Sequence, residues 1–278
     1  TFDASQTGSQ AWEPKNYDNK YEGPMSMRKG LSKSKNMISI RILDRIGPAY
    51  AQEYVTRFGF DPEKNPPYLT LALGAGAVTP LQLAGAYAVF ANGGYKINPY
   101  LISKITDNNG KTLFQVTPEK AGDENLRIID ARNAFLIDSM LKDVIKHGTA
   151  MRALSLKRSD IAGKTGTTND SIDAWFAGYH PKLVGVAWIG FDKPKNLGNR
   201  ETGGGLALPI WIGYMQKALP GIATVERETP SGITTAGGDY IYSENSDTGG
   251  VGSLGISPPS ESKPPPEKTE EGQKSELF

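Results

Sequence analysis

Three closely spaced segments decide the fold of this chain: IAGKTGT at residues 161–167, DAWFAGY at 173–179 and LVGVAWIGF at 183–191. Each segment has the length and composition of a β-strand. Only short turns separate the segments, and strands joined by short turns run antiparallel. The sequence therefore predicts an antiparallel sheet with these three strands side by side.

Helical patterns lie on both sides of this predicted sheet in the sequence. Helices are expected over the approximate ranges 26–46, 49–58, 79–91, 130–146 and 209–218, with Ser26, Thr79 and Asp130 as N-caps. A hairpin is expected around the turn Asn108-Asn109-Gly110. Helices followed by a meander of strands and a last helix favour an α+β fold, in which helices flank an antiparallel sheet.

Composition narrows the classes of function. The chain has 278 residues, 38% of them hydrophobic and 22% charged, which is the range of ordinary globular domains. A net charge of +1 without a basic run argues against a nucleic-acid partner. Two histidines and no cysteine argue against a protein-ligated metal, and we expect no cofactor. No apolar run approaches the roughly 18 residues of a membrane helix.

The chain divides into three parts by composition. Residues 1–24 form a polar, extended lead-in, residues 25–226 carry the helical and strand patterns, and residues 227–278 form a tail rich in Gly, Ser, Pro and Glu. Such a tail buries too little apolar surface to offset its ordering entropy, so we expect disorder from about Ser243. The chain opens Thr1-Phe2-Asp3 without a targeting segment, and we expect it to be a piece of a longer protein.

The strongest chemical signal lies in the first predicted strand, at Lys164-Thr165-Gly166-Thr167-Thr168. Lys-Thr-Gly on a strand is one of three motifs of the serine penicillin-recognising enzymes. An edge strand offers main-chain groups to an extended peptide. The lysine supplies positive charge near a nucleophile, the threonine hydroxyls donate to a substrate carboxylate, and the glycine leaves room above the strand. The tripeptide alone also arises by chance in surface turns.

A second motif, Ser34-Lys35-Asn36, lies 130 positions before Lys164. In that class of enzymes such a serine relays protons and such an asparagine holds a substrate amide. The same residues also occur at ordinary helix N-termini. The order and separation of the two motifs together favour the catalytic interpretation.

The third motif of the class, Ser-x-x-Lys, holds the nucleophile and its base. Matches begin at Ser26, Ser32 and Ser260. Ser26 has the character of a helix cap, Ser32 overlaps the second motif, and Ser260 lies in the tail. None has the apolar neighbours that would bury a lysine and lower its pKa. The sequence therefore predicts that the nucleophile is absent from this chain.

With these motifs the chain resembles the transpeptidase domain of the class A, bifunctional penicillin-binding proteins, and in particular their Gram-negative 1A type. The resemblance covers residues 12–237. It rests on these segments in family order: WEPKN (12–16), YEGP (21–24), SKN (34–36), TLALG (70–74), TPLQ (79–82), ANGG (91–94), RNAFLI (132–137), GKTGTT (163–168), DAWFAGY (173–179) and VAWIGFD (186–192).

The resemblance implies a serine penicillin-recognising fold that is incomplete at its N-terminal side. It implies a peptidoglycan D,D-transpeptidase, which crosslinks stem peptides through an acyl-serine and is acylated by β-lactams. Ser34, Asn36 and Lys164 are then catalytic: Ser34 shuttles a proton, Asn36 binds the substrate amide, and Lys164 adds positive charge. Thr165, Gly166, Thr167 and Thr168 bind substrate, and the main-chain N–H of Thr167 forms half of the oxyanion hole.

The resemblance also implies parts of the protein that this chain lacks. The nucleophilic serine is expected upstream of Thr1, with a glycosyltransferase domain and an inner-membrane anchor further upstream. The parent protein would then act in the periplasm, and the isolated chain would be inactive. Its expected partners are stem peptides, β-lactams and the upstream part of the same protein.

Two other interpretations remain open from the residues. A class A β-lactamase carries similar motifs, but residue 35 is Lys rather than Asp, and no Glu-x-x-Leu-Asn-like segment lies between Asn36 and Lys164. A non-catalytic cell-wall-binding or scaffold module would account for the missing nucleophile. Binding alone, however, gives no reason for Ser34, Asn36 and Lys164 to occur in family order.

Overall fold

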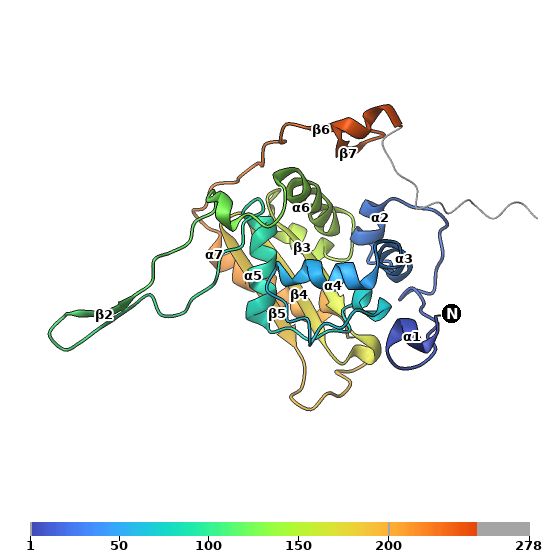
Figure 1. The fold of residues 1–278 in the computed structure, drawn as a ribbon, viewed down its shortest axis with the longest axis horizontal. Coiled ribbons are helices and arrows are strands. Elements are labelled where there is room, and N and C mark those ends of the chain that lie inside the picture. Colours follow the sequence, from blue (N-terminus) through green and yellow to red (C-terminus); the bar gives the residue numbers. More distant parts are fainter. Residues whose placement is uncertain (1, 200, 249–278) are drawn as a thin grey trace, which may run out of the picture.

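The computed structural model describes residues 2–199 and 201–248. A three-stranded antiparallel sheet in the order β3-β4-β5 lies at the centre of the fold (Figure 1). Its strands are β3 (Ala162–Thr167), β4 (Ala174–His180) and β5 (Leu183–Ile189). The strands β3 and β5 fall within the segments predicted from the sequence, and β4 extends one residue beyond its segment, to His180. Lys164 pairs with Ala177 of β4, so the Lys-Thr-Gly motif lies on a strand at the edge of the described sheet.

Apart from α1, which lies in the segment that was expected to be extended, the helices were expected at nearly the same places. The structure has the helices α1 (Ala4–Thr7), α2 (Met27–Ser32), α3 (Asn36–Ile46), α4 (Pro48–Thr56), α5 (Pro80–Ala91), α6 (Ala131–Lys146) and α7 (Leu208–Ala218). Shorter helical turns occupy η1 (Leu69–Leu73), η2 (Glu124–Leu126), η3 (Met151–Leu156), η4 (Asn169–Ser171) and η5 (Gly203–Ala207). The side chains of Ser26, Thr79 and Asp130 cap their helices as predicted, each accepting a backbone N–H of the first turn. The one expected helix over 26–46 is two, α2 and α3, because the chain turns at Ser34, where φ is +54°.

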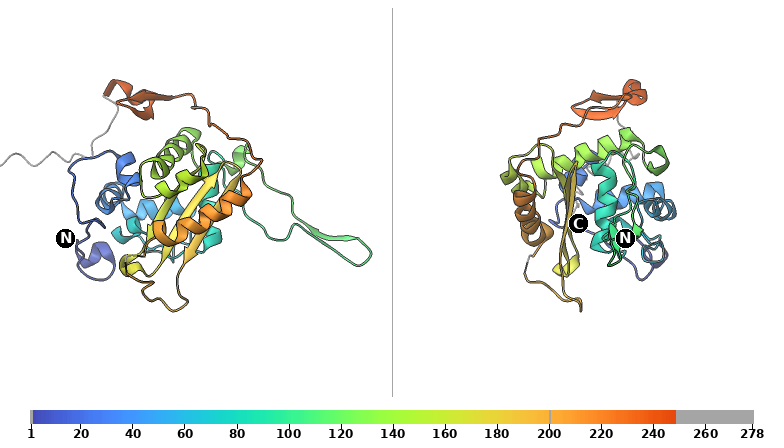
Figure 2. Two further views of the ribbon diagram at one scale, coloured as in Figure 1. Left: turned by 180° about the vertical axis from the view of Figure 1, so that it is seen from behind. Right: turned by 90° about the vertical axis from the view of Figure 1, so that its left-hand side faces the viewer.

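Helices cover both faces of the sheet, which confirms the α+β fold class. Figure 2 shows the sheet edge-on, with α7 on one face and α5 on the other. The indole of Trp211 in α7 lies over Gly178 and Gly185, which pair across β4 and β5. A Cβ at Gly178 would lie 3.0 Å from that ring, so the two glycines allow the helix to approach. The Trp211 N–H donates to the Gly178 carbonyl oxygen at 3.2 Å.

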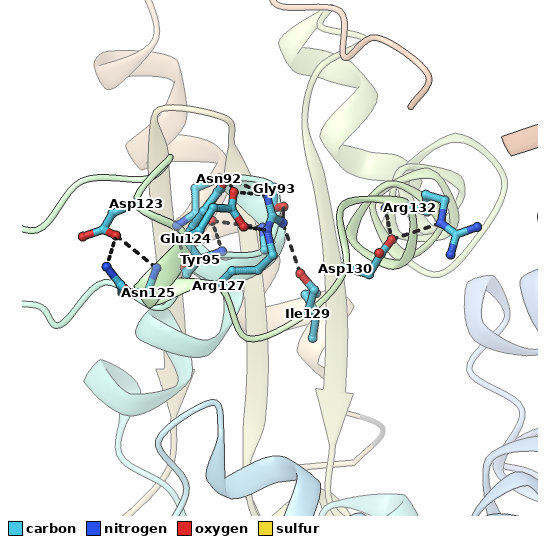
Figure 3. Close-up of polar contacts among 11 residues, drawn as sticks. Asn92, Gly93, Tyr95, Asp123, Glu124, Asn125, Arg127, Ile129, Asp130 and Arg132 are labelled. Atoms are coloured by element: carbon cyan, nitrogen blue, oxygen red, sulfur yellow. Dashed lines mark hydrogen bonds and ion pairs between the residues drawn. The ribbon is translucent and has the colours of Figure 1, made fainter. Parts of the chain in front are cut away.

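A long hairpin, β1 (Lys104–Thr106) and β2 (Thr112–Gln115), extends away from the body (Figures 1 and 2). A polar cluster at its base joins the two ends of the excursion (Figure 3). The guanidinium of Arg127 lies 4.2 Å from the centroid of the Tyr95 ring, and its Nε is 2.7 Å from Glu124. The same guanidinium donates to the carbonyl oxygens of Gly93 and Ile129. Arg127 therefore fixes where the hairpin leaves the domain.

The first part of the predicted tail lies on α6. Residues 233–242 form the hairpin of β6 (Ile233–Ala236) and β7 (Asp239–Tyr242), followed by η6 (Ser243–Thr248). The ring of Tyr240 contacts Phe135 edge-on at 5.0 Å, and Arg28 bridges Asp239 and Asp143. Residues 249–278, where most of the expected disorder falls, lie outside the described residues.

A buried charge cluster closes the end of the sheet. Asp160 is 1% exposed and lies 2.6 Å from Arg158 Nη2 and 2.9 Å from His180 Nε2. Burial raises the pKa of this carboxyl, but hydrogen bonds from Arg158 and Val225 and the nearby His180 outweigh burial and lower it to about 2. The cluster therefore ties β4 to the segment after α7.

We predict that Asp160→Asn lowers the free energy of unfolding by about 3 kcal/mol, because it removes one partner of a buried pair. The wild-type carboxylate stabilises the fold above about pH 4, and this contribution is lost as the pH falls towards the folded pKa of about 2. Urea unfolding across this range should show an acid-dependent loss that the variant lacks. Asp192→Asn, at an exposed position, serves as the control. Equal stability of the two variants would contradict this role of Asp160.

Candidate active site

The two sequence motifs meet in the structure. Lys164 Nζ donates to Ser34 Oγ at 2.7 Å and to the carbonyl oxygen of Thr165 at 2.8 Å. Residues 130 positions apart in the sequence thus form one polar pair. Both side chains are partly buried.

Ser34 lies near β3 because the backbone before it packs closely against the backbone after α6. A Cβ at Gly148, just after α6, would lie 2.1 Å from the Ser32 carbonyl oxygen. The same oxygen accepts the N–H of Thr149 at 3.2 Å. The end of α2 therefore lies directly against the end of α6, which packs on β3. Only a glycine at position 148 permits this spacing without movement of the backbone.

Burial changes the chemistry of Lys164. Desolvation disfavours the ammonium form and lowers the pKa of Lys164 from 10.5 to about 8. An amine with this pKa exchanges its proton readily near neutral pH, as general acid–base chemistry requires. The pair of Lys164 and Ser34 can therefore pass a proton between a side chain and a reacting group.

The hydroxyls of Thr165 and Thr167, which follow Lys164 on β3, contact residues from two other segments. Thr165 Oγ1 lies 2.6 Å from Thr149 Oγ1, and Thr167 Oγ1 accepts the N–H of Gly203 at 3.0 Å. A Cβ at Gly203 would lie 2.4 Å from the Gly166 carbonyl oxygen, so this segment packs tightly on the strand. These contacts fix the positions of the Thr165 and Thr167 hydroxyls on β3.

Thr168 and Asn36 make other contacts in this structure. The hydroxyl of Thr168 accepts the N–H groups of Ile172 and Asp173, at 3.1 and 2.7 Å, and so organises the turn between β3 and β4. The side-chain amide of Asn36 donates to the Lys15 carbonyl oxygen at 2.8 Å. The substrate roles assigned to both residues remain predictions.

Three Ser-x-x-Lys matches, at Ser26, Ser32 and Ser139, lie within the described residues. The match at Ser139, in α6, was not identified from the sequence, and the ammonium of its Lys142 lies 3.1 Å from the Asp138 carboxylate. The first match is a helix cap. The hydroxyl of Ser26 accepts the N–H of Lys29, and the Lys29 ammonium lies 2.9 Å from Glu22. The match at Ser260 lies outside the described residues.

The second match, Ser32 with Lys35, lacks a base. The Lys35 ammonium lies 2.8 Å from Asp18 and 3.1 Å from Glu22. Hydrogen bonds to these carboxylates raise the pKa of Lys35, so its amine stays protonated and cannot deprotonate a serine. The hydroxyl of Ser32 donates to the Lys29 carbonyl oxygen instead.

Three residues of the site were not identified from the sequence. Gly148 and Thr149 follow the predicted helix over 130–146, where a glycine is typical of a helix end. Lys35 is the variable position of its motif, although its side chain is only 5% exposed. The position of Lys35 between Ser34 and Asn36 was the one feature of the sequence that could have pointed to it.

A three-stranded antiparallel sheet between helices, with a Lys-Thr-Gly strand beside a Ser-x-Asn turn, defines the class of serine penicillin-recognising domains. Residues 1–209 match the family described as penicillin binding protein transpeptidase domain. The chain belongs to this family.

Relatives and solved structures agree with this assignment. The chain is 48% identical to penicillin-binding protein 1A of Neisseria flavescens, over 86% of this chain and 30% of that protein. Identity to penicillin-binding protein 1A of Pseudomonas aeruginosa is 40%, over 96% of this chain and 40% of that protein. The crystal structure of penicillin-binding protein 1A from Haemophilus influenzae superposes with a TM-score of 0.77 at 40% identity, over 82% of this chain and 39% of that chain. This chain thus spans about a third of the length of these relatives.

A structure with a bound β-lactam is also similar. PonA1 from Mycobacterium tuberculosis in complex with penicillin V gives a TM-score of 0.67 at 25% identity, over 78% of this chain and 62% of that chain.

Among residues 2–199 and 201–248 of the present chain, none of the helices is long and apolar enough to span a bilayer.

We predict that Lys164 titrates near pH 8, whereas exposed lysines titrate at about pH 10.4. Isotope-edited NMR of the lysine side chains measures both values. Ser34→Ala should leave the pKa of Lys164 low, because burial rather than the serine lowers it. A Lys164 midpoint in the range of exposed lysines would contradict the described burial.

Proposed function

We propose that this chain is part of a peptidoglycan D,D-transpeptidase that crosslinks stem peptides and is acylated by β-lactams. The hydrogen bond of 2.7 Å between Lys164 Nζ and Ser34 Oγ carries this proposal. It joins the two family motifs in a pair that can move a proton, beside a strand edge that can accept an extended peptide.

The proposed reaction has two steps. A serine oxygen attacks the carbonyl of the D-Ala-D-Ala bond, the C–N bond breaks, and D-alanine leaves with a proton. An amine of a second stem peptide then attacks the acyl-serine, loses a proton and releases the serine hydroxyl. Ser34 relays these protons, and Lys164 supports Ser34 with its amine.

Substrate binding is proposed along β3. The hydroxyls of Thr165 and Thr167 hold the terminal carboxylate, Gly166 leaves space for the peptide, and the N–H of Thr167 stabilises the oxyanion. Asn36 binds the substrate amide after exchanging its present contact with Lys15. Thr168 contributes through the turn that it organises.

We propose further that the nucleophilic serine and its lysine belong to an upstream part of the same protein. The contacts of the matches at Ser26, Ser32 and Ser139 support this, because the lysine of each match is paired with a carboxylate. Residues 25–226 are then the C-terminal part of the transpeptidase domain, between a lead-in (1–24) and a tail (227–278). The parent protein is proposed to carry a glycosyltransferase domain and an inner-membrane anchor, and to act in the periplasm.

Labelling with a fluorescent penicillin tests the location of the nucleophile. We expect no covalent label on the isolated chain, because it lacks the acylated serine, and stoichiometric label on the full-length protein. Circular dichroism of the isolated chain should accompany the assay to establish that it is folded. Robust labelling of the folded chain would overturn the upstream assignment.

Substitution of Lys164 tests the catalytic proposal in the full-length protein. Lys164→Ala should slow acylation by about a hundredfold or more, the usual loss when a proton-transfer group is removed. Lys182→Ala, at an exposed position in the turn between β4 and β5 of the same sheet, is the matched control and should acylate normally. Unchanged acylation of Lys164→Ala would favour a scaffold. Rapid turnover of the β-lactam by the wild type would favour a β-lactamase.

A further inference from the structure

The middle residue of the Ser34-Lys35-Asn36 turn is held by the lead-in. The Lys35 side chain is 5% exposed, and its ammonium lies 2.8 Å from Asp18 and 3.1 Å from Glu22. A lysine this buried requires paired charges, since its ammonium has lost most of its water. The two carboxylates supply that pairing from a segment that forms no helix or strand at residues 13–25.

The residues after Lys35 contact the same segment. The Asn36 side chain donates to the Lys15 carbonyl oxygen at 2.8 Å, and the Met37 N–H donates to Asn16 Oδ1 at 3.1 Å. Asn16 is only 6% exposed. Residues 15–22, which we name the lead-in strap, therefore grip three consecutive residues next to Ser34.

Ser34 needs such support because of its backbone. Its φ of +54° lies in the left-handed region, which a serine adopts only when its surroundings impose it. The N–H of Lys35 closes the turn on the Gly30 carbonyl oxygen at 2.8 Å. Fixing the Lys35 side chain on the far side of the turn then fixes the direction of the Ser34 hydroxyl towards Lys164.

Glu22 and Lys35 both stay charged near neutral pH. Hydrogen bonds from Lys29 and Lys35 lower the pKa of Glu22 to about 2, and the hydrogen bond to Asp18 raises the pKa of Lys35. Lys33 also faces Glu22, at 3.5 Å, but its side chain is 43% exposed. Only Lys35 combines burial with contacts to both carboxylates.

From this geometry we infer that Lys35, held by Asp18 and Glu22 of the lead-in strap, is a positioning residue that aims Ser34 at Lys164. The inference rests on the proposed transpeptidase function, because it assigns Lys35 an effect on acylation through Ser34. Lys35 itself touches neither the Lys164 amine nor a reacting atom in this role.

The test is a double-mutant cycle in the full-length protein, with acylation by a fluorescent penicillin followed by stopped flow. Lys35→Met keeps the length of the side chain and removes its charge. We expect the acylation rate constant to fall by about tenfold or more, as misplacement of a catalytic group predicts, with the dissociation constant of the non-covalent complex within about twofold of the wild-type value. In a Ser34→Ala background the same substitution should have almost no further effect.

Matched variants separate positioning from general damage. Lys33→Met makes the same charge change at an exposed neighbour and should acylate like the wild type. Lys35→Arg keeps the charge and should recover most of the lost rate. If Lys35→Met fails to fold, Asp18→Asn provides the cycle, with an expected loss of about threefold, because Lys35 then keeps only Glu22.

Each outcome bears on a distinct claim. A wild-type protein that is not acylated would overturn the proposed function and this inference with it. With normal wild-type acylation, an unchanged rate in Lys35→Met would overturn the inference alone. So would equal losses in Lys35→Met and Lys33→Met, or a Lys35→Met effect that adds fully to that of Ser34→Ala.

Discussion

The hydrogen bond between Lys164 and Ser34 depends on how closely three backbone segments can approach. Gly148 lets the end of α6 lie against the end of α2, since a Cβ there would come within 2.1 Å of the Ser32 carbonyl oxygen. Gly30 lets α2 and α3 cross, since its Cβ would lie 2.6 Å from Ile38 Cγ2. The site is therefore built on two close approaches to a glycine, by main chain at Gly148 and by the Ile38 side chain at Gly30. Side-chain chemistry comes second, because it is useful only at the spacing that the two glycines allow.

The surroundings of two lysines near Ser34 shift their pKa values in opposite directions. Burial without a carboxylate partner favours the neutral amine of Lys164, whose pKa is lowered to about 8. Hydrogen bonds to Asp18 and Glu22 raise the pKa of Lys35 and keep it charged. Environments that separate the pKa values of like groups are how a fold assigns chemical roles. Lys164 is suited to exchange a proton, and Lys35 is suited to hold the backbone in place.

Much of the framework could be predicted because it depends on local signals. The cap at Thr79 and the three strand segments follow from residues within one turn or one strand of each other. The pairing of Lys164 with Ser34 was predictable only from the resemblance to a family, since nothing local joins positions 130 residues apart. The burial of Lys35 and the contact of Thr149 with Thr165 were not predictable, because both depend on tertiary approaches of segments that carry no apolar pattern. Single polar contacts between distant segments produce no periodic pattern in a sequence.

The alternation of side chains along β3 gives Lys164 and Thr165 different surroundings. Successive residues of a strand point to opposite faces, so the amine of Lys164 and the hydroxyl of Thr165 leave the strand on different sides. Ser34 receives the former and Thr149 the latter, at 2.7 and 2.6 Å. Among the described residues, no strand pairs with the outer edge of β3. An extended segment that added to this edge would therefore have the Lys164 amine on one side of the strand and the Thr165 hydroxyl on the other.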